Sequence, residues 1–172
     1  MSIREIKKYP DAVLRAKTAR VNVIDQSIQL LIDDMIETMH AAPGVGLAAN
    51  QVGVSLQLAV IDLGDREEDE PRHPLLVLIN PEIVSMQGSV VAEEGCLSIP
   101  DFSEKVKRAA RVKVRAQDRT GKPYELEAEG LMAKALQHEI DHLNGLLFID
   151  RLSPLKKNIF RRKMKKSLVE TA

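Results

Sequence analysis

The chain is organised around one stretch, Leu131-Met132-Ala133-Lys134-Ala135-Leu136-Gln137-His138-Glu139-Ile140-Asp141-His142. Its first seven residues are mostly good helix formers, and it ends in the pattern H-E-x-x-H. Residues four apart lie one above the other on a helix face, so His138 and His142 can bind one divalent ion. Glu139 beside them is the expected general base. A catalytic site of this kind still needs a third protein ligand and an open position for water.

The third ligand is expected upstream. Phe148 occupies the position at which metzincin proteases carry a third His. The acidic residues that follow are Asp150, expected at a strand end, and Glu170, near the C-terminus. The chain has one cysteine, Cys96, and a thiolate with two imidazoles leaves one position for water. A lone cysteine is by itself more often a small buried apolar residue, but the histidine pair favours a ligand.

Three blocks of the sequence resemble the peptide deformylase family. They are Gly44-Val45-Gly46-Leu47-Ala48-Ala49-Asn50-Gln51, Glu94-Gly95-Cys96-Leu97-Ser98 and His138-Glu139-Ile140-Asp141-His142. The resemblance extends over nearly the whole chain, from Tyr9-Pro10-Asp11 to the basic C-terminal segment. It implies a metal-dependent hydrolase that removes the N-formyl group from the N-terminal formylmethionine of newly made polypeptides and releases formate.

The resemblance also implies roles for individual residues. Cys96 and the two histidines would hold the ion, and Glu139 would move the proton. The side-chain amide of Gln51 and the backbone N–H of Leu97 would donate hydrogen bonds to the oxyanion. Gly46 would meet the substrate through its main chain.

The methionine side chain of such a substrate needs an apolar pocket. Leu131 and Ala135 precede His138 by seven and three positions, so they share its helix face and, with Val45, are the expected lining. Lys134 lies close to the same face and is expected to extend outward along its stem.

Two further positions concern the substrate side of the site. Glu94 is expected among the substrate-binding residues, and a pairing with Arg108 would hold the loop of Cys96. Ser103 stands where many members of the family carry an Arg that contacts the peptide, so a different peptide preference is expected.

Composition predicts one globular catalytic domain over residues 1–172. The chain is 44% hydrophobic and only 3% aromatic without Trp, so an aliphatic core is expected. One Cys excludes an internal disulfide and is typical of a reducing compartment. No signal peptide or membrane span is evident, so a cytoplasmic protein is expected.

Periodicity predicts an α+β fold with antiparallel sheets around the central H-E-x-x-H helix. An N-terminal helix is expected from Asp25 or Ser27. Strands are expected at residues 56–62, 75–79, 110–117 and 124–128, with strand-like pieces around Gly88 within residues 82–92. Pro81 is expected to mark a turn after the second strand. No repeat and no linker interrupt the chain.

A basic C-terminal helix is expected over residues 153–170. Residues 151–172 hold eight Lys or Arg against one Glu, whereas residues 1–150 carry a balance of −7. Such a helix is either a solvated charged surface or a contact for a polyanion. The resemblance implies that it docks on the ribosome.

The ligand types leave the ion and two other functions open. Cysteine and histidine suit iron, zinc, nickel or cobalt, and the resemblance implies one Fe²⁺ per chain. The H-E-x-x-H pattern alone is equally typical of a metallopeptidase. A ribosome-associated or RNA-binding protein with a structural metal is the third possibility, but a structural site would be closed by a fourth protein ligand.

Overall fold

The computed structural model describes residues 2–68 and 72–171. Its helices are α1 (Gln26–Ala41), α2 (Gly130–Leu143) and α3 (Pro154–Thr171). Its strands are β1 (Gly46–Ala48), β2 (Leu58–Ile61), β3 (Leu76–Gln87), β4 (Val90–Cys96), β5 (Ile99–Arg108), β6 (Arg111–Gln117) and β7 (Pro123–Glu129). Short 3-10 helices are η1 (Ala12–Leu14), η2 (Ala49–Val52), η3 (Gly64–Arg66) and η4 (Phe148–Arg151).

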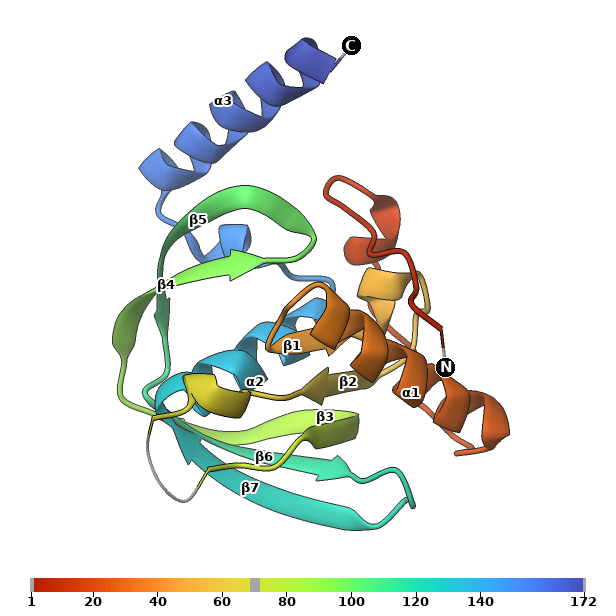
Figure 1. Cartoon of the computed structure of the whole chain (residues 1–172). Helices are drawn as coiled ribbons and strands as arrows, with labels where there is room; N and C mark the ends of the chain where they lie inside the picture. Colours follow the sequence, from red (N-terminus) through yellow and green to blue (C-terminus); the bar gives the residue numbers. More distant parts are fainter. Residues whose placement is uncertain (1, 69–71, 172) are drawn as a thin grey trace.

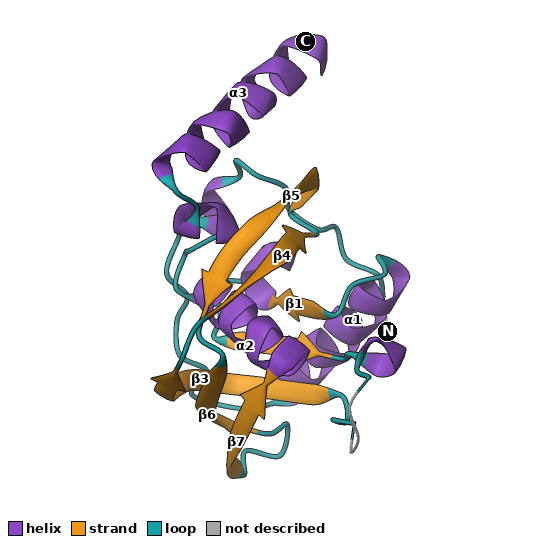
Figure 2. Cartoon of the chain, turned by 90° about the vertical axis from the view of Figure 1, so that its left-hand side faces the viewer, coloured by secondary structure: helices purple, strands orange, loops and turns teal. Residues whose placement is uncertain are grey.

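The strands form two antiparallel sheets. One sheet has the order β1-β2-β3-β6-β7, and the other is the hairpin of β4 and β5. Figures 1 and 2 show α2 between the two sheets, while α3 extends away from the rest of the molecule. The expected α+β fold around the H-E-x-x-H helix is therefore confirmed.

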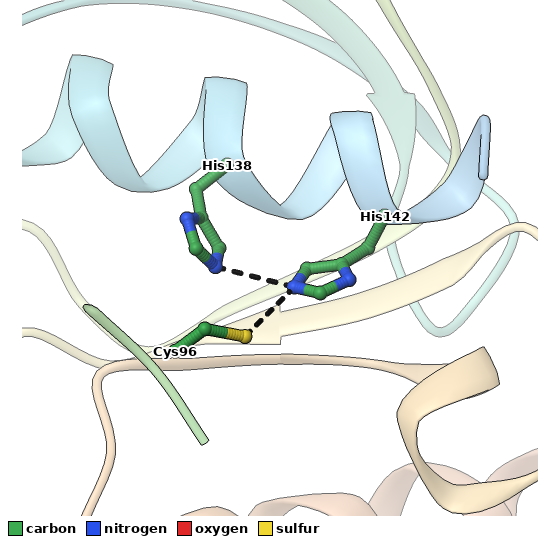
Figure 3. A group of neighbouring side chains, drawn as sticks. All are labelled: Cys96, His138 and His142. Atoms are coloured by element: carbon green, nitrogen blue, oxygen red, sulfur yellow. Dashed lines mark hydrogen bonds between the residues drawn. The ribbon is translucent and has the colours of Figure 1, made fainter. Parts of the chain in front are cut away.

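Helix α2 occupies the centre because two of its faces are buried. One face packs in the core with the five-stranded sheet through Met132, Ala133, Leu136, Ile140 and Leu143. These residues recur at helical spacing, as an amphipathic helix requires. The other face directs two histidines toward the end of β4 (Figure 3). The helix thus links the hydrophobic core to the candidate site.

Helix α1 covers the neighbouring part of the same sheet. The carboxylate of Asp25 caps it by accepting a hydrogen bond from the backbone N–H of Ile28, at 3.1 Å. Its buried stripe packs with apolar side chains of β1 and β2, and consists of Ile28, Leu31, Ile32, Met35 and Met39. The expected N-terminal helix is present and is capped by the first of the two expected residues.

The turn expected at Pro81 is wrong, because β3 continues through it to Gln87. Asn80 has a positive φ of 53°, and the register with β6 shifts between Ile79 and Glu82. The irregularity tolerates a proline, which lacks the N–H that a regular ladder needs. The Asn80 side chain bonds the backbone N–H and C=O of Val21, which holds the irregular point in place.

Two other local expectations differ from the structure. Strand β5, one arm of the small hairpin, is not among the strands expected from periodicity. Asp150 was expected at a strand end but lies in η4, where its carboxylate accepts from the backbone N–H of Leu147 at 2.8 Å and pairs with Arg15. A capping role, rather than strand pairing, accounts for its position.

Helix α3 is anchored near its middle. Phe160 is buried, and its ring centroid lies 5.3 Å from that of Tyr9 and 4.9 Å from that of Phe102. Most described side chains around Phe160 on this helix are exposed. Among the described helices, none combines the length and apolar character needed to cross a bilayer.

Candidate metal centre

The structure brings Cys96, His138 and His142 together although they are up to 46 residues apart. The Sγ of Cys96 lies 3.3 Å from Nε2 of His142, which lies 3.2 Å from Nε2 of His138. Figure 3 shows both imidazoles pointing from α2 toward the sulfur at the end of β4. The three candidate ligand atoms lie within 4.8 Å of one another.

These distances fit one tetrahedral ion. Metal bonds of about 2.0–2.1 Å to nitrogen and 2.3 Å to sulfur would separate the donor atoms by about 3.3–3.6 Å. The observed separations of 3.2 and 3.3 Å are close to these values. Among the described residues, no fourth His, Cys, Asp or Glu joins the group, so the set resembles an open catalytic site more than a closed structural one.

Behind His138 lies a buried carboxylate that orients its ring. The Nδ1 of His138 lies 2.9 Å from Oε1 of Glu94. A Nδ1–H that donates to a carboxylate fixes the tautomer with Nε2 free for a metal. Glu94 in turn accepts from Nε and Nη2 of Arg108, at 2.8 and 2.9 Å. The expected Glu94–Arg108 pair is present, and both side chains are only 3% exposed.

These contacts also change the interpretation of Glu94. It borders a pocket, yet both of its oxygens are engaged by Arg108 and His138. Burial alone would raise the pKa of this carboxyl, but the hydrogen bonds from those two partners lower it to about 2. Glu94 is therefore an ionised support for a candidate ligand, and its contacts do not favour the expected substrate-binding role.

The two histidines have different surroundings. Burial lowers the pKa of His138. The charge of Glu139 and the hydrogen bonds of His138 with Cys96 and Glu94 outweigh burial and raise this pKa well above 6.5. Burial and the charges of His138 and Arg108 lower the pKa of His142. Its Nδ1 is buried without a hydrogen-bond partner among the described residues.

Glu139, the expected general base, is buried beside the two histidines. It is 3% exposed, and its Oε1 has no hydrogen-bond partner among the described residues. Burial raises its pKa to about 7, the range that suits a general base near neutral pH. A Cβ at Gly46 would lie 2.5 Å from Oε2 of Glu139, so the glycine permits the carboxylate to lie against the β1 backbone.

The two expected oxyanion donors lie beside this group. The Oε1 of Gln51 accepts from the backbone N–H of Ala48 at 3.0 Å, which fixes the amide orientation. The Nε2 of Gln51 then donates to Oγ of Ser98 at 3.0 Å and lies 3.6 Å from Sγ of Cys96. Leu97 follows Cys96 directly and borders the same pocket. Their roles as donors remain predictions.

A pocket of about 690 Å³ opens onto these residues. The expected methionine-binding residues Val45, Leu131 and Ala135 line it, as do Gly46 and Glu139. The apolar side of the pocket therefore lies next to Glu139, the candidate base. The volume of the pocket is within the range of small-ligand sites.

Polar side chains line another part of this pocket. Lys134 extends its stem so that Nζ donates to the backbone oxygen of Glu93, at 3.1 Å. Ser103 donates to the carboxylate of Glu93, at 2.7 Å. The side chain of Lys134 thus extends outward as expected, and its ammonium group contacts β4 at the wall of the pocket.

Sequence reasoning missed several residues that support the site. Asp141 pairs with Arg108, and Arg151 pairs with Asp141 in turn. Phe148, which cannot bind a metal, stacks on His138 with ring centroids 6.3 Å apart. One feature of the sequence could have indicated that Asp141 is buried. It lies inside the H-E-x-x-H pattern, on a helix that is buried on two faces.

Comparison with known proteins agrees with this arrangement. The polypeptide deformylase family model matches residues 3–158. A peptide deformylase of Syntrophobacter fumaroxidans is 57% identical over 170 residues, covering 99% of this chain and 98% of that protein.

Solved structures are similar over the same length. A peptide deformylase from Legionella pneumophila has a TM-score of 0.87 at 51% identity, covering 99% of this chain and 98% of the other. One from Ehrlichia chaffeensis, in complex with actinonin, has a TM-score of 0.89 at 41% identity, covering 97% and 98%. The likeness in sequence and structure spans both sheets and the H-E-x-x-H helix, and the chain therefore belongs to the polypeptide deformylase family.

Proposed function

We propose that this chain hydrolyses the N-formyl group of formylmethionine at the N-terminus of newly made polypeptides. Water adds to the formyl carbon, the C–N bond breaks, and formate and a free amine leave. The observation that carries the proposal is the Cys96–His138–His142 group at a pocket with an apolar wall. Beside this group lies a carboxylate oxygen of Glu139 that has no hydrogen-bond partner among the described residues. Residues 1–172 then act as one catalytic domain.

Metal binding and proton transfer are assigned to different residues of the site. Cys96, His138 and His142 would hold a divalent ion, whose Lewis acidity would make a water molecule nucleophilic near neutral pH. Glu139 takes a proton from the attacking water and passes one to the departing nitrogen. Its raised pKa, about 7, suits both transfers.

Binding and charge stabilisation come from the surrounding loops. The amide of Gln51 and the backbone N–H of Leu97 donate to the developing oxyanion, where losing one donor typically costs about 2.7–4 kcal/mol in the barrier. Val45, Leu131 and Ala135 contact the methionine side chain. The main chain of Gly46 meets the peptide backbone.

The ion, the cellular partner and the compartment belong to the same proposal. The physiological ion is Fe²⁺, one per chain, which the thiolate and imidazole donors accept along with zinc, nickel or cobalt. The basic helix α3 extends from the molecule and binds the ribosome, a polyanion matched to its charge. The protein works in the cytoplasm, where nascent chains are made.

The test compares formate release from formyl-Met-Ala-Ser by the parent, Cys96→Ala and Glu139→Gln. Cys96→Ala is expected to lose bound metal. Glu139→Gln is expected to keep the metal and lose roughly 10²–10⁴-fold in turnover. Unformylated Met-Ala-Ser is the matched substrate, and its cleavage would instead indicate a peptidase. Formate release by Glu139→Gln at the parental rate would contradict the proposal.

A further inference from the structure

Arg151 lies outside the candidate site, yet it ends a continuous chain of ionic hydrogen bonds that starts at His138. We propose that Arg151 is a positioning residue for the metal centre, which acts on His138 through Asp141, Arg108 and Glu94. The inference rests on the proposed function only in that the two histidines and Cys96 bind a metal.

The outer link is a two-point contact. Nε and Nη2 of Arg151, from η4, donate to Oδ2 and Oδ1 of Asp141 at 2.6 and 2.7 Å. Asp141 is only 8% exposed, whereas Arg151 is 43% exposed. Two parallel bonds between a guanidinium and a carboxylate set direction as well as distance. Arg151 therefore fixes the plane of the Asp141 carboxylate from the protein surface.

The inner links pass that orientation on. Arg108 donates through Nη1 to Asp141, and through Nε and Nη2 to Glu94. Its guanidinium is rigid and planar, so its position relative to Asp141 determines where it presents donors to Glu94. Glu94 then holds Nδ1 of His138 at 2.9 Å. Each group in this chain is fixed by the one before it.

Charge balance makes the outer cation necessary. Glu94 and Asp141 are carboxylates, Arg108 and Arg151 are guanidiniums, and the four alternate in sign along the chain. Without Arg151, Asp141 would share the guanidinium of Arg108 with Glu94 and would lack full compensation of its charge. Water in the neighbouring cavity, which Asp141 and Arg108 border, would then compete for Asp141. The orientation of Arg108 toward Glu94 would loosen as a result.

A second ion pair on η4 provides a matched control. Arg15 pairs with Asp150, the residue before Arg151, and the Arg15 side chain is 40% exposed. This pair also ties η4 to a distant segment, but among the described residues neither partner hydrogen-bonds to Asp141, Arg108 or Glu94. Arg15→Met should thus reproduce any general loosening of η4 without touching the chain that leads to His138.

The experiment measures the rate at which zinc-loaded protein releases zinc to a chromophoric chelator. Losing an outer partner of a metal-ligating His typically costs 10–100-fold in affinity, and Arg151 stands three residues further out. We expect Arg151→Met to release zinc about threefold to tenfold faster than the parent. Arg15→Met should release zinc at the parental rate. Arg151→Lys keeps the charge but loses the two-point contact, so it should fall between parent and Arg151→Met.

A double variant tests whether the effect passes through Glu94. If it does, adding Arg151→Met to Glu94→Gln will not accelerate release beyond Glu94→Gln alone, because coupled residues are not additive. Multiplying effects, or equal release by Arg151→Met and Arg15→Met, would overturn the proposal. A parent that binds no zinc would instead contradict the proposed function, so the two failures are distinguishable.

Discussion

Replacing Arg108 with methionine should destabilise the protein more than any single change to a surface ion pair. The substitution keeps much of the stem's volume and removes the guanidinium. Glu94 and Asp141 would then be buried carboxylates without their shared cation, since Arg108 and Glu94 are each 3% exposed. Surface pairs typically contribute 0–1 kcal/mol, whereas breaking a buried pair costs about 3–5 kcal/mol.

The pKa of Glu94 gives an independent magnitude. Its partners lower this pKa from 4.5 to about 2, and each pKa unit corresponds to about 1.4 kcal/mol. The interaction that favours the ionised form is therefore worth on the order of 3 kcal/mol. Because this agrees with the general cost of breaking a buried pair, we expect Arg108→Met to lower the unfolding free energy by about 3–5 kcal/mol.

The assay is urea unfolding of the metal-free protein at pH 7, which separates stability from metal binding. Parent, Arg108→Met, Glu94→Gln and the double variant form one cycle. The double variant should lose clearly less unfolding free energy than the sum of the two single losses, because each single variant leaves a buried charge without its partner. Additive losses would refute the reasoning, since they would mean that Glu94 and Arg108 do not interact.

Acid pH supplies a second check on the same pair. The folded-state pKa of Glu94 lies below its ordinary value of 4.5, so its contribution to stability is complete above about pH 4.5. That contribution disappears as pH falls toward 2, because the folded state must then bind a proton that the unfolded state already holds. The stability difference between the parent and Glu94→Gln should shrink over this range. A difference independent of pH would contradict an ionised Glu94.

Two further changes test other contacts. Gly46→Ala would place a methyl group 2.5 Å from Oε2 of Glu139, so formate release should fall by roughly 10²-fold while metal content, measured by elemental analysis, stays at the parental level. Burial raises the pKa of Tyr124 to about 12, so its contribution to stability is complete below pH 10 and is lost as pH rises toward 12. The thermal midpoint of Tyr124→Phe should therefore fall less than that of the parent over this range.

Local patterns in the sequence were enough to predict the centre of the site. The spacing of His138 and His142 identifies one helix face, and few side chains can serve as a third soft ligand, so a single cysteine narrows the choice to Cys96. The predicted pairing of Glu94 with Arg108 is also present. The predicted side chains do lie together, and their roles as metal ligands stay predictions. Local patterns could identify them because ligand chemistry admits few residue types.

The outer support of the site could not be predicted in the same way. Asp141 and Arg151 are ordinary charged residues, and such residues are usually solvated. Only the fold shows that Asp141 lies in a buried layer between Arg108 and Arg151. Burial depends on which elements pack together, and a periodic pattern within one helix does not contain that information.

The fold shows the same limit at Pro81. A proline usually ends a strand, so a turn is the natural prediction from sequence. The strand continues because Asn80 adopts a positive φ and bonds with Val21, a residue 59 positions away. Gln117 of β6 also accepts from the Asn80 amide. The irregularity is thus stabilised by tertiary contacts that local propensity does not reveal.

The H-E-x-x-H helix places two identical ligand types in unequal surroundings, and this inequality explains why the supporting residues gather on one side. His138 has Glu94 behind it and Phe148 stacked on it. The Nδ1 of His142 has no partner among the described residues. A ring without such a partner must be held by packing and by the backbone of α2, and His142 is only 1% exposed. The ring of His138 borders the pocket and needs the charged partner Glu94 to fix its orientation. The ring of His142 is enclosed by the core and does not need such a partner.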